Sequence, residues 1–250
     1  MKRKLIVALA CRNTGSRLYG KPLQNLDIDK GISILDNIIS CLKQIEVIDD
    51  IVLGIAEGVE NVVFVEFANV NNIGYIRGDE DDVLSRLIQC GDFGSATDIF
   101  RSTSESPFLY FDLIEQAWEQ HIQNNNDATF LDDIIDGCGF EILSLDALKK
   151  SHKDGEEKHR SEFCTLYIRE NKDKFRIEYI TPPGKLKRKD IRLTVDYPED
   201  LIVCRAVYEN FKDFAPNIPL LDIVDYLDKN THLLKLTLPF CEEGYSTMYL

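Results

Sequence analysis

The sequence predicts an α/β fold in which a mostly parallel, Rossmann-like sheet is flanked by helices. Two patterns indicate this fold class. Residues 5–10 (LIVALA) are continuously apolar, which is typical of a strand buried on both faces. Similar short runs alternate with stretches of helical period, an order that favours parallel strands joined by helices. The length of 250 residues suits one such domain with a small inserted subdomain.

Strands and helices are expected to alternate along the chain. Apolar side chains recur at helical spacing over 34–42, and 50–56 (DIVLGIA) has the composition of a second buried strand. A run of acids precedes the helical pattern that begins at residue 83, so Asp81 or Asp82 is expected to cap that helix. The other expected elements are strands at 73–77, 97–101, 128–131, 175–180 and 191–195, helices at 61–69, 112–124, 143–150, 161–171, 201–211 and 220–228, and a basic hairpin at 182–189.

The net charge and the apolar content of the chain limit the classes of partner that it can bind. The formal net charge is −14, which disfavours nucleic acid as the main partner. No apolar run approaches the roughly 20 residues of a membrane span, so we expect a cytoplasmic protein without a membrane partner. Seven cysteines without a CxxC pair indicate reduced thiols and no zinc site.

The loop after the first strand carries cations among small residues. Arg12, Arg17 and Lys21 stand near Gly15 and Gly20, and the chain up to this point contains no acid. Glycines let the backbone approach a ligand closely, and arginine and lysine neutralise phosphate charge. Neither the Walker pattern nor GxGxxG is present. This composition favours a polyphosphate site, and an ordinary surface loop is the alternative.

Two acids stand at the ends of expected strands. Glu105 follows the strand at 97–101 in a serine-rich turn, and Asp196 ends the strand at 191–195. Ligands of open parallel sheets bind beyond the carboxyl ends of the strands. Either acid can hold a cation there, and either can instead cap a turn or helix.

Several motifs resemble those of the SpsF-like cytidylyltransferases, which activate sugar acids, and more distantly those of the CMP-Kdo and CMP-sialate synthetases. Residues 12–23 resemble the signature loop of these enzymes, with Thr14-Gly15 in place of Gly-Ser and Tyr19 in place of Pro. Residues 192–201 (RLTVDYPEDL) match R-L-T-x-D-x-P-E-D-L closely. Looser matches are R-G-x-x-x-D-V-L-x-R at 77–86, R-x-T-G-D-C-P at 101–107, D-G-x-x-x-E-x-x-S at 136–144 and R-E-H-x-T-P-Y at 161–167.

The resemblance implies the nucleotide-diphospho-sugar transferase type of fold and a role for each matching residue. It makes Arg12, Lys21 and Asp196 catalytic, and it gives Asp196 and Glu105 a Mg²⁺ ion to hold. The implied sugar-acid contacts are Asp136, Glu141 and Glu162. The implied nucleotide-binding residues are Ala10, Arg12, Asn13, Thr14, Gly15, Arg17, Lys21, Arg77, Gly78, Asp82, Val83, Thr103 and Ser104.

The resemblance also implies how the chain is organised. Residues 1–230 are expected to form a single nucleotidyltransferase domain. Within it, 130–190 is expected to be an insertion that lines the sugar site and joins two copies into a homodimer. Residues 231–250, which the resemblance does not cover, are expected to form a C-terminal tail.

The expected reaction is attack of a sugar-acid oxygen on the α-phosphate of CTP, for surface glycan biosynthesis. Arg12, Arg17 and Lys21 would stabilise the departing pyrophosphate, and Mg²⁺ would bridge the phosphates. A different nucleotide or a non-sugar acceptor is one alternative. A glycosyltransferase, suggested by the Asp-Glu-Asp triplet at 79–81, is another. Glu105 and Phe163 replace an aspartate and a histidine of the family, which leaves a non-catalytic nucleotide-binding protein as the third.

Overall fold

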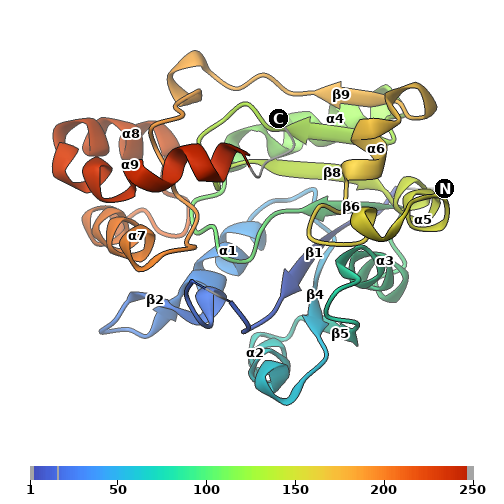
Figure 1. Cartoon of the computed structure of the whole chain (residues 1–250), viewed down its shortest axis with the longest axis horizontal. Helices are drawn as coiled ribbons and strands as arrows, with labels where there is room; N and C mark the ends of the chain where they lie inside the picture. Colours follow the sequence, from blue (N-terminus) through green and yellow to red (C-terminus); the bar gives the residue numbers. More distant parts are fainter. Residues whose placement is uncertain (1–2, 16, 247–250) are drawn as a thin grey trace.

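A seven-stranded sheet runs through the middle of the molecule (Figure 1). The computed structural model describes residues 3–15 and 17–246. All strands of this sheet run in one direction except β8, which is antiparallel to both of its neighbours, so the predicted mostly parallel sheet is confirmed. In spatial order the strands are β5 (Gly74–Gly78), β4 (Asp50–Ala56), β1 (Leu5–Cys11), β6 (Asp98–Arg101), β8 (Phe140–Ser144), β7 (Ala128–Leu131) and β9 (Ile177–Tyr179).

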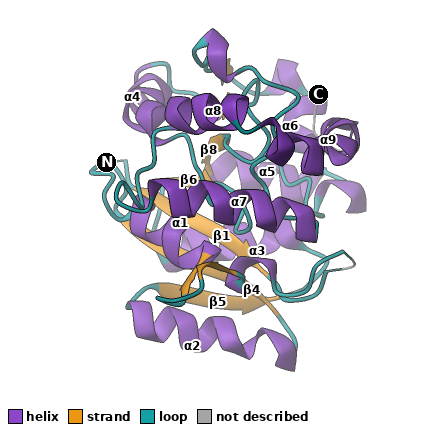
Figure 2. Ribbon diagram, turned by 90° about the vertical axis from the view of Figure 1, so that its left-hand side faces the viewer, coloured by secondary structure: helices purple, strands orange, loops and turns teal. Residues whose placement is uncertain are grey.

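Helices cover both faces of the sheet, as Figures 1 and 2 show. Along β1, Leu5, Val7 and Leu9 pack into one core, and Ile6 and Ala8 pack into the other. The strand is continuously apolar because both of its faces are buried. The helices on the first side are α1 (Ile34–Leu42), α2 (Val62–Asn71), α4 (Ile114–Gln123), α7 (Pro198–Phe211) and α8 (Leu220–Lys229), and those on the second are α3 (Val83–Phe93), α5 (Leu145–Asp154) and α6 (Leu166–Glu170).

Side-chain caps define where the helices begin. The short strands β2 (Asn25–Asp27) and β3 (Ile32–Ser33) form a separate antiparallel pair that leads into α1. Ser33 accepts a hydrogen bond from the N–H of Asp36 at 3.0 Å, and Asp36 accepts one from the N–H of Ser33 at 2.9 Å. Asp82 accepts a hydrogen bond from the N–H of Ser85 at 2.8 Å, which confirms the predicted cap of α3.

The strand β8 is missing from the sequence-based expectation, which placed a helix over 143–150. The helix α5 begins at Leu145 because the Ser144 hydroxyl caps it, accepting a hydrogen bond from the N–H of Ala147 at 3.2 Å. The residues before this cap pair with both β6 and β7. Strands β8 and β9, which belong to the region 130–190, thus extend the main sheet.

Residues 191–195 do not form the expected strand. They form one isolated β-bridge, between Arg192 and Asp136. Their N–H groups bond instead to loops: Leu193 donates to the carbonyl of Asp136 at 2.9 Å, and Val195 donates to that of Glu105 at 3.1 Å. The segment therefore ties two loops together at the carboxyl end of the sheet.

Two further expectations about this part of the chain are wrong. Residues 182–189 form no hairpin, because β9 pairs in parallel with β7 and the chain then turns into a short 3₁₀ helix at Gly184–Leu186. Within 161–171, only Leu166–Glu170 is α-helical.

The C-terminal residues form a helix that packs on the domain. Helix α9 (Thr231–Ser246) lies against α7 and α8 (Figure 1). Leu233, Thr237 and Cys241 are buried in this contact. The last four residues of the expected tail lie outside the described residues. In the described part of the chain, every helix is too short or too polar to cross a lipid bilayer.

Candidate active site

A cavity of about 530 Å³ opens at the carboxyl ends of β1 and β6. The loops after β1 and after β6 form two of its walls. The turn between β7 and β8 and the segment before α7 complete the far side. The predicted site residues that line this cavity are Ala10, Arg12, Thr14, Gly15, Arg17, Lys21, Val83, Thr103, Ser104, Glu105, Asp136, Glu141, Glu162 and Asp196.

The cationic loop and Asp196 meet inside this cavity. The Lys21 ammonium donates to Asp196 Oδ1 at 2.6 Å, across a sequence separation of 175 residues. The Arg17 guanidinium lies 3.5 Å from the same oxygen. Burial by itself would raise the pKa of Asp196, but the hydrogen bond from Lys21 and the nearby cationic charges outweigh burial and hold that pKa below its ordinary value. Asp196 is therefore ionised at neutral pH.

Glycines give the loop its shape. Gly20 has a positive φ of 61°, and its N–H donates to the Asn13 carbonyl at 3.0 Å, which closes the loop. At Gly15 an added Cβ would lie 2.5 Å from the Leu18 carbonyl oxygen, so any side chain would force the loop open. Lys21 follows directly after the turn at Gly20. Its direction toward the cavity thus depends on this turn.

Arg192 organises the acids on the other side. This side chain is 2% exposed and donates to Asp136 at 2.7 Å, to Asp200 at 3.1 Å and to Asp196. Asp200 in turn accepts hydrogen bonds from the N–H groups of Asp196 and Tyr197, each at 2.9 Å. Asp196 is therefore held through both its side chain and its backbone.

Glu105 stands beside this ion-pair cluster. Burial raises the pKa of its carboxyl above the ordinary value, the charge of Asp196 raises it further, and Lys21 opposes both effects. The Ser104 hydroxyl lies 3.2 Å from Glu105 Oε2 and 2.8 Å from the Ala10 carbonyl oxygen. Ser104 thus ties the two walls of the cavity together.

Asp196 and Glu105, the two acids predicted to hold Mg²⁺, line one cavity, and the charge of Asp196 raises the pKa of Glu105. Among the described residues, no group of three or more His, Cys, Asp or Glu side chains is arranged to hold a metal. Mg²⁺ usually binds through one or two carboxylates together with substrate phosphates. The donor set of Asp196 and Glu105 fits an ion of this kind, because a cation would offset the repulsion between the two carboxylates, which adds to burial in raising the pKa of Glu105.

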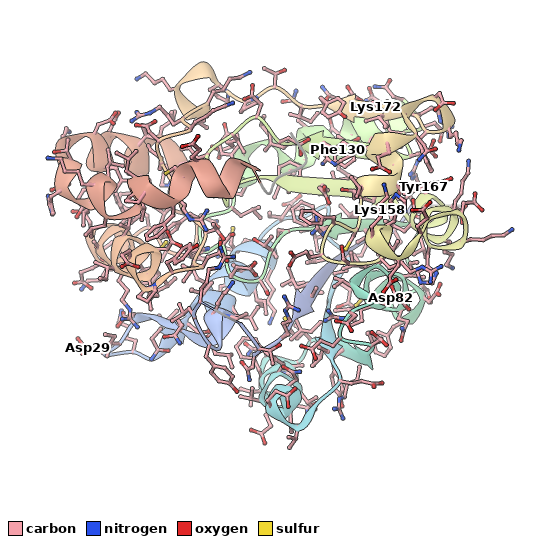
Figure 3. The ribbon with its side chains drawn as sticks, in the orientation of Figure 1. Asp29, Asp82, Phe130, Lys158, Tyr167 and Lys172 are labelled. Atoms are coloured by element: carbon pink, nitrogen blue, oxygen red, sulfur yellow. The ribbon has the colours of Figure 1, made fainter. Side chains whose placement is uncertain are left out.

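The acids predicted to contact the sugar are held by arginines. Glu141 is buried and accepts from Arg101 at 2.6 Å and from Arg169 at 2.9 Å. Burial would raise the pKa of Glu141, but these two cations hold it below its ordinary value. The guanidinium carbon of Arg169 lies 3.7 Å from the centre of the ring of Phe130, which is labelled in Figure 3.

Asp136, the second of these acids, is buried and paired with Arg192. Burial raises its pKa to about 6, more than the charge of Arg192 lowers it. Glu162, the third, is exposed and lies 3.7 Å from the Arg12 guanidinium. In this structure Asp136 and Glu141 therefore position arginines at the cavity.

Four predicted nucleotide-binding residues lie outside the cavity lining. The Asn13 N–H donates to Asn61 Oδ1 at 2.7 Å, and the Arg77 guanidinium donates to the Gly58 carbonyl at 3.2 Å. Asp82, labelled in Figure 3, caps α3 and contacts His152 Nε2 at 2.7 Å. The four residues outside the lining are Asn13, Arg77, Gly78 and Asp82.

Three arginines of the lining complete the site: Arg86, which the resemblance places beside the base or ribose, and Arg101 and Arg192, which were not predicted as site residues. Arg86 is 1% exposed and donates to the Gly54 carbonyl at 2.7 Å and the Glu80 carbonyl at 3.2 Å. All three stand inside the motifs that carry the family resemblance. The signal was therefore present, but a motif does not reveal which of its residues face a cavity.

Among the described residues that line the cavity, the one cysteine is not an activated nucleophile. Cys11 lines it, but burial raises the pKa of this thiol to about 12, so it stays protonated at neutral pH. The arrangement can bind a polyphosphate between cations and carboxylates. It is suited to positioning and charge neutralisation.

Known proteins match this fold closely. The SpsF protein of Bacillus subtilis, a spore coat polysaccharide biosynthesis protein, is 22% identical over 231 residues, which cover 90% of this chain and 95% of SpsF. The solved structure of a cytidylyltransferase from Leptospira borgpetersenii has a TM-score of 0.82 at 20% identity, and the match covers 93% of this chain and 97% of that one. The CMP:2-keto-3-deoxy-manno-octonic acid synthetase complexed with CTP has a TM-score of 0.61 at 13% identity, with 83% and 99% covered.

The structural matches confirm the nucleotide-diphospho-sugar transferase type of fold. A family model described as cytidylyltransferase matches residues 6–233, from the first strand to the start of α9. This range includes the cationic loop, Glu105 and Asp196. A match over nearly the whole chain leaves one conclusion: the chain belongs to the cytidylyltransferase family.

Proposed function

We propose that the protein transfers CMP from CTP to a sugar acid and releases pyrophosphate, with Mg²⁺ as its cofactor. We propose further that it works in the cytoplasm as a homodimer and supplies surface glycan biosynthesis. The observation that carries the proposal is the meeting of the cationic loop with Asp196 and Glu105 at one cavity.

The nucleotide phosphates bind at the cationic end. Arg12, Arg17 and Lys21 line the cavity and neutralise the charge that develops on the leaving pyrophosphate. Asp196 and Glu105 would hold Mg²⁺, which supplies charge neutralisation at the phosphates when bound. The bond that forms joins the acceptor oxygen to the α-phosphorus, and the bond that breaks joins the α-phosphorus to the pyrophosphate oxygen. The proton of the acceptor hydroxyl leaves to solvent. Arg192 keeps Asp196 oriented during this exchange.

The acceptor binds at the arginine end of the cavity, and Arg101 recognises its carboxylate. Arg192 is almost fully buried and already serves three carboxylates, whereas the Arg101 side chain is 17% exposed and lines the cavity. Glu141 and the Glu162 carbonyl, at 2.6 Å and 3.0 Å, hold its guanidinium in place. A sugar acid is supported by the structural similarity to the CMP:2-keto-3-deoxy-manno-octonic acid synthetase, and a glycan role by the sequence similarity to SpsF, a spore coat polysaccharide biosynthesis protein.

The Asp-Glu-Asp triplet at 79–81 gives little support to a glycosyltransferase. Asp79 uses one carboxylate oxygen to accept from the N–H groups of Asp81 and Asp82, at 2.8 and 3.0 Å. This contact builds the turn before α3. None of the three acids lines the cavity.

A pyrophosphate-release assay tests the proposal. CTP, UTP, GTP and ATP are each incubated with Mg²⁺ and a series of sugar acids. We expect release with CTP and at least one sugar acid, and no release without Mg²⁺. Release with a different nucleotide alone would contradict the CTP assignment. CTP binding without pyrophosphate release in the presence of any of the acceptors would favour a non-catalytic protein.

A substitution at Asp196 tests the metal assignment in the same assay. Asp196→Asn removes a negative charge beside the phosphates and keeps the size of the side chain. We expect Mg²⁺-dependent release to be lost while part of the CTP affinity remains. Unchanged Mg²⁺ dependence of release would argue against Asp196 as a metal ligand.

A further inference from the structure

Helix α9 contacts the residue next to Asp196 through an aromatic pair. The ring of Phe240 stacks on that of Tyr197, with centroids 4.0 Å apart and planes inclined by 13°. Tyr197 directly follows Asp196 and precedes the first residue of α7. The C-terminal helix therefore touches the residue next to the proposed metal ligand.

Tyr197 also contacts Arg17 of the cationic loop. The Arg17 guanidinium carbon lies 4.8 Å from the centre of the Tyr197 ring, and one guanidinium nitrogen donates to the Tyr197 hydroxyl at 3.2 Å. The contacts run in sequence from Phe240 through Tyr197 to Arg17, and Arg17 then reaches Asp196 at 3.5 Å.

The residues that make these contacts differ in rigidity. Two hydrogen bonds from backbone N–H groups to Asp200 fix the backbone at Tyr197, and the packing of α9 on α7 fixes Phe240. The Arg17 side chain, in contrast, is 40% exposed and projects from a loop. A long exposed side chain loses conformational freedom when it binds an anion, and a ring that already orients it reduces this loss.

We propose that Phe240 is a positioning residue, which acts through Tyr197 to hold Arg17 toward the phosphates of the nucleotide. This inference rests on the proposed binding of a nucleoside triphosphate in the cavity. Phe240 lies beyond residues 6–233, the range that the family model matches. The contact thus adds an element outside the matched domain to the phosphate site.

Binding measurements test this without knowledge of the acceptor. The affinities of CTP and of inorganic pyrophosphate are measured by calorimetry for the wild-type chain, Phe240→Ala and Phe240→Tyr. Leu238→Ala is the matched control, because Leu238 lies on the same helix and is 54% exposed. We expect Phe240→Ala to weaken pyrophosphate binding by about 3- to 10-fold, as the loss of one aromatic pair predicts. Phe240→Tyr should retain the affinity because its ring can still stack.

A double-mutant cycle separates positioning from a general loss of packing. In an Arg17→Ala background, Phe240→Ala should weaken binding no further, since the side chain that it positions is already gone. A full additional loss there, or equal affinities of Phe240→Ala and Leu238→Ala, would overturn the inference and leave the proposed function intact. If the wild-type chain binds neither CTP nor pyrophosphate, the proposed function itself fails, and the inference with it.

Discussion

At the scale of single residues, the contact between Lys21 and Asp196 dominates the site. The ammonium neutralises the aspartate at 2.6 Å, and Arg17 and Arg192 approach the same carboxylate. Arg192 is shared with Asp136 and Asp200, whereas Lys21 and Arg17 belong to the loop that is proposed to bind the phosphates. The cluster thus places the cations proposed to bind the phosphates next to the carboxylate proposed to bind Mg²⁺.

Lys21→Ala should abolish pyrophosphate release and leave the fold intact. Removing one donor that stabilises developing charge typically costs about 100-fold or more in rate. The measurement is pyrophosphate release from CTP, with circular dichroism as the check on folding. Lys30→Ala is the control, because Lys30 is exposed in the turn between β2 and β3. Equal rates for the two variants would defeat the assignment of Lys21.

Asp136 should make stability depend on pH. Burial raises its pKa to about 6, so the folded chain binds this proton more tightly than the unfolded chain does. The resulting stabilisation is present at low pH and is lost as pH rises from about 4 to about 6. Asp136→Asn should reduce the fall in unfolding free energy between pH 4.5 and 6.5 by on the order of 1–2 kcal/mol, measured by urea denaturation.

The control for this pH measurement is Asp225→Asn, since Asp225 is exposed on α8. Its fall in unfolding free energy should match that of the wild-type chain. If Asp136→Asn shows the same fall as both, the carboxyl of Asp136 does not titrate in this range.

At the scale of elements, loops rather than strands place the acids. The segment 191–195 bonds to the turn after β7 through Leu193 and to the loop after β6 through Val195. Asp196 follows this segment, so its position depends on both loops. A close approach of the turn to the segment requires a glycine at 137, where φ is 90°.

Gly137→Ala should therefore destabilise the fold and weaken the reaction together. The added Cβ would lie 2.6 Å from the backbone nitrogen of Thr194, and the conformation itself disfavours a side chain. We expect a loss of about 1–3 kcal/mol in unfolding free energy and slower pyrophosphate release. Gly184→Ala is the matched control, because nothing lies within 4 Å of a Cβ at that position. Equal stability of the two variants would count against a close approach at Gly137.

At the scale of the whole molecule, the region 130–190 supplies one end of the sheet. Strand β9 forms an edge, and Tyr179 at its end is 47% exposed. An exposed edge strand with an aromatic side chain is suited to contact another chain. This supports the proposal that two copies associate through this region.

Tyr179→Arg should then convert the proposed homodimer to a monomer. An arginine removes the aromatic contact and brings two cations together across a two-fold interface. Sedimentation velocity measures the change, and Phe214→Arg is the control because Phe214 is 58% exposed between α7 and α8. A monomeric wild-type chain would contradict the proposed homodimer, and a dimeric Tyr179→Arg variant would place the interface elsewhere.

Much of this fold could be predicted from the sequence, because local patterns carry it. The continuous apolar run of β1 indicates a strand buried on both faces, and the apolar side chains of α1 recur at the spacing of a helix with one buried face. The cationic loop was recognisable because small residues and cations follow a buried strand. The antiparallel strand β8 was not predictable in the same way, since its pairing with β6 and β7 depends on partners far along the chain.

The sequence by itself thus determined the fold class, the cationic loop and the family motifs, since each depends on residues close together in the chain. Only the tertiary structure decided which charges meet: Asp196 faces Lys21, whereas Asp200 serves the backbone and Arg192. It also turned Asp136 and Glu141 toward arginines. The attraction between two charges weakens with distance and strengthens with burial, because the interior has a lower dielectric constant, and distances between residues far apart in the chain are set only when the sheet and its loops are assembled.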